Sequence, residues 1–62
     1  MKYKINDRII ITVNDTEYEA IIDEIESDRI WCHIPPKHHG YVYTARRWDF
    51  TISEYGKTWK LL

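Results

Sequence analysis

Apolar and polar residues alternate along much of the chain, and this period of two is typical of strands that bury one face. Residues 8–13 (Arg-Ile-Ile-Ile-Thr-Val) are rich in β-branched side chains and lie between two Asn-Asp pairs, which favour turns. Residues 29–34 (Arg-Ile-Trp-Cys-His-Ile) form a second such segment. It ends at Pro35 and Pro36, because proline cannot donate a hydrogen bond to a ladder.

The C-terminal third continues this pattern. We expect strands at 41–45, 48–53 and 58–61, after an exposed loop at 37–40. The last two are predicted to pair as a hairpin, with Gly56 in a turn that requires a positive φ.

Residues 16–26 fit two patterns. With a helical period, their apolar side chains make one stripe and Thr16 and Glu19 form a possible capping box. With a period of two, Ile21 and Ile25 fall on the wrong face unless a bulge shifts the register. We favour the bulged strand, because Ser27-Asp28 is a compact turn into the next strand and an isolated acidic helix of this length is marginal.

Five or six short strands without a second helix predict an all-β fold, a small antiparallel SH3-like barrel, in one domain at 1–62. The alternative is an α+β fold with one short helix at 16–26. The predicted core consists of Ile9, Ile11, Val13, Tyr18, Ile22, Ile25, Ile30, Cys32, Ile34, Val42, Phe50, Ile52, Trp59 and Leu61.

The order of these elements resembles SH3-like small barrels over about the first 43 residues. The resemblance lies in strands that open with Asp7-Arg8-Ile9 and Asp28-Arg29-Ile30, and in the strand segment 18–25 between them. The chain is also similar to the amino-terminal split-barrel domains of flagellar-brake proteins, where a strand that ends in Ile-Pro precedes a glycine-containing loop. The resemblance implies an interaction module and transfers no site residues, since the arginine motif of the companion domain has no counterpart here.

Composition narrows the setting. Nine basic and ten acidic side chains give a net charge of −1. This charge excludes a histone-like protein that coats DNA, because such a protein is strongly basic. Cys32 is the only cysteine, so an internal disulfide is impossible and a cytoplasmic protein is expected. No apolar run is long enough to span a membrane, and the start at Met1 suggests a complete small gene product.

Charge is distributed unevenly along the sequence. Residues 14–28 hold seven acids and no base, whereas residues 29–48 hold four bases and no acid. One end of the molecule is expected to be negative and another positive, unless the fold interleaves the two segments.

The sequence gives little support for an active site or for a metal site. Cys32, His33, His38 and His39 are ligand types for zinc, but their spacing matches no standard finger, and Cys32 and His33 face opposite sides of a strand. A nucleophile elbow, P-loop or zinc-protease motif is absent from the sequence. We therefore expect no enzyme, no cofactor and no metal site.

Aromatic and basic residues are interleaved around the loop between Trp31 and Trp48. Such a surface suits a protein partner, for which Trp, Tyr and Arg are typical anchors, or single-stranded DNA or RNA, whose bases stack on aromatic rings. We favour a protein partner because the net charge is negative. A row of carboxylates at 15–28 can also imitate a phosphate backbone, as in small acidic phage or mobile-element proteins, and so regulate a nucleic-acid-processing complex. The predicted contact residues are Arg29, Trp31, His33, Lys37, Tyr41, Tyr43, Arg46, Arg47 and Trp48.

Overall fold

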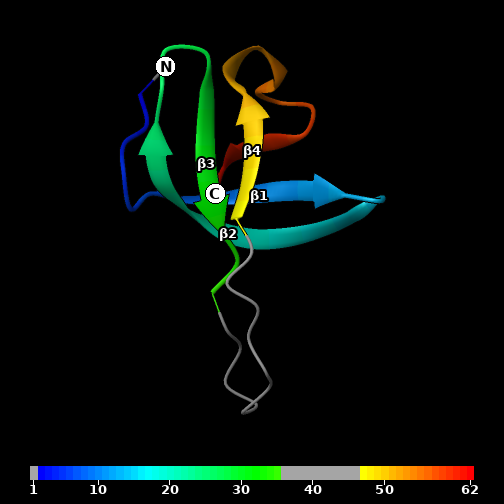
Figure 1. Cartoon of the computed structure of the whole chain (residues 1–62). Coiled ribbons are helices and arrows are strands. Elements are labelled where there is room, and N and C mark those ends of the chain that lie inside the picture. Colours follow the sequence, from blue (N-terminus) through cyan, green and yellow to red (C-terminus); the bar gives the residue numbers. More distant parts are fainter. Residues whose placement is uncertain (1, 36–46) are drawn as a thin grey trace.

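The computed structural model describes residues 2–35 and 47–62, and these form a curled antiparallel sheet with the shape of a half-barrel (Figure 1). The strand order is β4-β3-β2-β1-β5. The strands are β1 (Arg8–Val13), β2 (Thr16–Ile25), β3 (Arg29–His33), β4 (Arg47–Thr51) and β5 (Trp59–Leu61), with a short 3-10 helix η1 (Ile52–Glu54). The predicted all-β class is confirmed, and the arrangement is compatible with an SH3-like barrel. The predicted strand 41–45 lies outside the described residues.

The hairpin between β1 and β2 closes with a two-residue turn. Asn14 and Asp15 have φ values of 51° and 65°, and Val13 pairs with Thr16 across them. Positive φ at both central residues defines a type I′ turn, whose twist matches that of the flanking strands. Asn and Asp tolerate this conformation better than other residues that carry a Cβ, which explains why the pair occurs here.

Strand β2 belongs to both halves of the sheet. Its first part pairs with β1 as far as Ile21, and its last part pairs with β3, from Ile21↔His33 to Ile25↔Ile30. The register shifts between Ile22 and Glu24, so the bulged strand is confirmed and the helix alternative is wrong. In Figure 1, β2 bends from lying beside β1 to lying beside β3, as a bulge with strong local twist allows.

The predicted hairpin between β4 and β5 is wrong. β5 pairs with β1 (Ile9↔Leu61), while β4 pairs with β3, so the two strands lie at opposite ends of the strand order. Between them, η1 and the turn around Gly56 redirect the chain, and Gly56 has the expected positive φ of 90°. Alternation predicts strands correctly, but it does not say which strand is the partner.

The inner face of the sheet forms the core. Six predicted core residues are essentially buried, and Ala20 joins them. Val13, Ile25, Ile34, Phe50, Ile52 and Leu61 pack against this cluster while partly exposed, together with Tyr3, Trp48 and Tyr55. The predicted burial of Tyr18 is wrong: its side chain is 41% exposed, because this part of β2 pairs only with β1 among the described strands. Val42 lies outside the described residues.

Trp59 closes the core where β4 ends. Its side chain is 1% exposed and meets the rings of Tyr3 and Tyr55 edge to face, with centroid distances of 5.3 and 4.9 Å. Its indole N–H donates to the backbone oxygen of Thr51 at 3.0 Å, so the buried polar atom is satisfied. This bond ties the start of β5 to the end of β4, although the two strands are not paired.

Candidate functional site: the Trp31 face

The candidate site is the outer face of β2, β3 and β4 around Trp31. In β3, Ile30 and Cys32 are fully buried, whereas Arg29, Trp31 and His33 alternate with them and point away from the core. Strand pairing then places Asp49 of β4 and Glu24 of β2 directly beside Trp31. The described Trp31 face comprises Asp23, Glu24, Glu26, Asp28, Arg29, Trp31, His33, Arg47 and Asp49.

The structure places five of the nine predicted contact residues. Arg29, Trp31, His33 and Arg47 share the outer face. Trp48 is opposite Cys32 and packs against the core, so it lies on the other side of the sheet. The remaining four lie outside the described residues: Lys37, Tyr41, Tyr43 and Arg46.

Trp31 is held from two sides. Its indole N–H donates to the Glu26 carboxylate at 3.3 Å, and the Arg47 guanidinium lies 5.0 Å from the ring centroid. A guanidinium over an indole face at an exposed site contributes about 0.5–1 kcal/mol. Trp31 is therefore a half-buried aromatic side chain whose orientation is fixed by its own neighbours.

Arg47 and His33 share acceptors on β2. The Arg47 Nη2 donates to Glu24 at 3.0 Å, and its Nε lies 3.7 Å from Asp23. The His33 Nδ1 lies 2.7 Å from the other oxygen of Asp23, which accepts its hydrogen bond. The β2 bulge supplies both acids, because residue 23 is the extra residue in the register shift.

Arg29 is paired on both sides. Its guanidinium lies 2.7 Å from Asp49 across the sheet and 3.4 Å from Asp28, the preceding residue. The hydrogen bonds and charge of Asp28, followed by those of Asp49, raise the pKa of Arg29 above its ordinary value. Arg29 therefore stays protonated, and two carboxylates of the same chain already balance its positive charge.

The fold interleaves the two charged segments. Among the described residues, each arginine of the Trp31 face lies beside two acids, mostly from the acidic segment. With His33 counted as neutral, five carboxylates against two guanidinium groups give the described face a formal net charge of −3. Sequence reasoning placed the bases here but missed the acids. The signal was available, since a compact turn at 27–28 necessarily brings residues 23–26 beside residues 29–33.

Cys32 and His33 lie on opposite sides of β3, as alternation predicts. Burial raises the pKa of the Cys32 thiol to about 12, and the Asp23 and Asp49 carboxylates add to the shift. A thiol in that state is a poor nucleophile and a poor metal ligand. Within residues 2–35 and 47–62, three or more potential metal ligands do not gather at any point.

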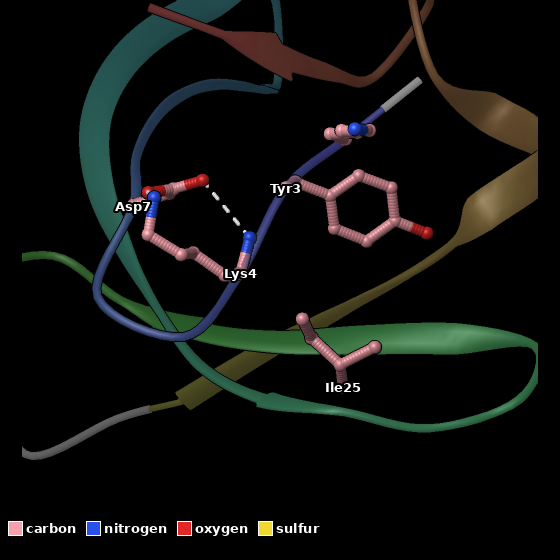
Figure 2. A pocket seen from close by; sticks show the side chains of 5 residues that line it. Tyr3, Lys4, Asp7 and Ile25 are labelled. Atoms are coloured by element: carbon pink, nitrogen blue, oxygen red, sulfur yellow. Dashed lines mark hydrogen bonds and ion pairs between the residues drawn. The ribbon is translucent and has the colours of Figure 1, made fainter.

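A pocket lies away from the Trp31 face. An open pocket of about 600 Å³ is lined by Lys2, Tyr3, Lys4, Asp7 and Ile25, between the N-terminal segment and the end of β2 (Figure 2). Lys4 and Asp7 already satisfy each other there, through an ion pair of 3.3 Å and a backbone N–H bond of 2.9 Å. The sequence patterns gave no indication of this pocket.

Comparison with family models, curated proteins and solved structures finds no significant match for this chain. None of the helical structure in the described ranges has the length and apolar character that a membrane crossing requires. Any inference about function therefore rests on the geometry of the Trp31 face.

Proposed function

We propose that this chain is a non-enzymatic, SH3-like binding module of the cytoplasm that acts by holding a protein partner on the Trp31 face. The single observation behind this proposal is the partly exposed Trp31, which a carboxylate and a guanidinium hold in place on the outer face of the sheet. Interfaces are commonly anchored by Trp and Arg side chains with charged groups around them.

Pre-organisation supports a docking role. A side chain that is ordered before binding loses less conformational entropy when a partner arrives, and each rotamer-rich side chain costs about 0.5–1.5 kcal/mol to immobilise. Glu26 and Arg47 hold Trp31 from two sides in the unbound chain. The direction of the indole ring is therefore set before a partner arrives, and the Glu26 bond keeps it without Arg47.

The state of the arginines favours protein over single-stranded nucleic acid. A nucleic-acid groove presents free cations to successive phosphates. Here Arg29 and Arg47 already contact carboxylates at 2.7 and 3.0 Å, and a phosphate would have to displace those acids. The same acids suit a role in regulating a nucleic-acid-processing complex, where they would meet the basic groove of its protein.

The experiment compares three immobilised proteins in affinity capture from a cell extract: the wild type, Trp31→Ala and Tyr18→Ala. Tyr18 is the matched control, because it is an exposed aromatic residue on the free arm of the β1–β2 hairpin. A partner that is retained by the wild type and by Tyr18→Ala, and lost by Trp31→Ala, supports the proposal. Equal capture by all three contradicts it.

A fluorescence titration with a single-stranded oligonucleotide tests the alternative. Nucleic-acid binding predicts tryptophan quenching at low salt, with an affinity that falls linearly in a log-log plot against salt. If the oligonucleotide quenches the wild type and not Trp31→Phe, the Trp31 face binds nucleic acid, and the proposed protein partner is wrong. Flat fluorescence at low salt is the expected result.

A further inference from the structure

The charge and the aromatic ring of the Trp31 face together identify the kind of partner surface it fits. The Trp31 face carries five carboxylates, and three of them are well exposed: the side chains of Glu24, Asp28 and Asp49 are 53%, 66% and 41% accessible. Only Arg29 and Arg47 offset them within the described face. A basic surface complements this arrangement, whereas an acidic one is repelled.

The ring of Trp31 is already arranged to hold a cation. Its face carries a guanidinium group, that of Arg47, with Glu24 closing the ion pair on one side. A second carboxylate, Asp23, lies 3.7 Å from the Arg47 Nε, and Glu26 accepts the indole N–H at the edge of the ring. A π face with carboxylates beside it is the arrangement that recognises an arginine. Arg47 occupies this site as an intramolecular ligand.

Arg47 is also a replaceable occupant. Its side chain is 46% exposed and is held by surface ion pairs, which are individually weak because water and salt screen them. A cation from another chain gains the same ring and carboxylate contacts, and it brings further charges to the exposed carboxylates of the face.

We propose that the Trp31 face binds an arginine- or lysine-rich segment of a protein, with one cationic side chain replacing Arg47 over Trp31. This inference rests on the proposed function and specifies the chemistry of its partner. It reverses the role that the sequence suggests for Arg47, which becomes a competitor of the partner and not a contact to it.

The experiment titrates the protein with hexa-arginine, and separately with hexaglutamate, at ionic strengths of about 0.01 M and 0.15 M, where the Debye length falls from about 30 to about 8 Å. We expect saturable fluorescence changes with hexa-arginine that weaken at least about tenfold at the higher salt. Hexaglutamate is expected to have no effect. Binding of hexaglutamate, or the absence of hexa-arginine binding at low salt, would overturn the inference.

Two pairs of variants separate a local site from general charge attraction. The double variant Glu24→Gln with Glu26→Gln is expected to weaken hexa-arginine binding at least about tenfold. The control Asp15→Asn with Glu17→Gln removes the same two charges from the exposed hairpin arm and leaves binding within about twofold. Arg47→Ala is expected to tighten binding several-fold, because it uncovers the ring and frees Glu24. Lys60→Ala removes the same charge from β5, at the other end of the strand order, and is expected to change little.

The signs of these effects decide the outcome. Weaker binding by Arg47→Ala would show that Arg47 contacts the partner, and would contradict the inference. Equal effects of a variant and its control would mean that binding depends only on net charge, which also contradicts it. Partner capture that depends on Trp31, combined with failure of hexa-arginine to bind, would keep the proposed function and remove only this inference. Loss of both would remove the proposed function as well.

Discussion

Trp59 and Trp31 are the same residue type in one small sheet, and their surroundings differ in every respect. Trp59 is 1% exposed, stacks edge to face with two tyrosines and donates its N–H to a backbone oxygen. Trp31 is partly exposed, lies beneath a guanidinium and donates its N–H to a carboxylate. The first environment consists of groups that folding must bury, and the second consists of charges that remain in reach of solvent. The comparison teaches that Trp59 maintains the fold and that Trp31 is available for contact.

The largest expected effect is the loss of Trp59. Trp59→Ala should lower the free energy of unfolding by about 3–5 kcal/mol, because it leaves a cavity in a thin core and removes the bond to Thr51. A domain of this size has little more stability than that, so the variant is expected to be largely unfolded. Urea denaturation followed by circular dichroism measures the change.

Trp31→Ala is the matched control for that variant. Its expected loss is below about 1 kcal/mol, since the ring is on the surface and its contacts are screened. Comparable losses for the two tryptophans would break the distinction between a structural and an exposed residue.

The next effect concerns pH and the inner face just behind Trp31. The folded chain keeps the Cys32 proton until a pKa of about 12, whereas the ordinary value is 9.0. The unfolded chain therefore binds fewer protons above pH 9, so this thiol lowers the stability as pH rises, by at most about 1.4 kcal/mol per pH unit.

The measurement is the urea midpoint between pH 8 and pH 10.5, in the wild type and in Cys32→Ala. Tyrosine and lysine titrations are common to both proteins, so the wild type should show the steeper decline. Parallel curves would mean that water reaches Cys32, and that the inner face is less sealed than its burial indicates.

The smallest of these effects tests the turn that brings Trp59 into place. Gly56 has a φ of 90°, and its N–H donates to the Trp59 oxygen at 2.7 Å. A Cβ added at Gly56 would meet no atom within 4 Å, so Gly56→Ala changes backbone strain alone. We expect a loss of about 1 kcal/mol.

Gly56→Asn is the control for this turn, because asparagine adopts positive φ more readily than alanine. Thermal unfolding should rank glycine above asparagine and asparagine above alanine. An alanine variant as stable as the wild type would show that the backbone relaxes to negative φ without displacing Trp59.

Local patterns predicted those parts of the fold that depend on neighbouring residues. The bulge in β2 followed from the position of Ile21 and Ile25, and the turn at Asn14-Asp15 followed from its residue types. The prediction that Tyr18 belongs to the core was wrong, because alternation shows on which face a side chain lies and not whether another strand covers that face. The pairing of β5 with β1 was missed for a related reason: the choice of partner depends on contacts that are distant in sequence.

The candidate site was predictable in the same partial way. Alternation in β3 placed Arg29, Trp31 and His33 on one side, and that placement holds. Trp48 lies on the core side, because its register against Cys32 is set by strand pairing that no local pattern contains. The ion pairs that neutralise the arginines were hidden for the same reason, and they change the sign of the described face.

The position of β5 has a consequence for how the molecule assembles. Three of the four described pairings join strands that follow one another in sequence, whereas the fourth joins Ile9 to Leu61 across nearly the whole chain. Closing so long a loop is slow relative to forming hairpins, because its entropy is lost before its contacts are gained. The rate-limiting event in folding should therefore be the docking of the last strand, and the exposed edge of β1 is the surface at risk of mispairing until that moment.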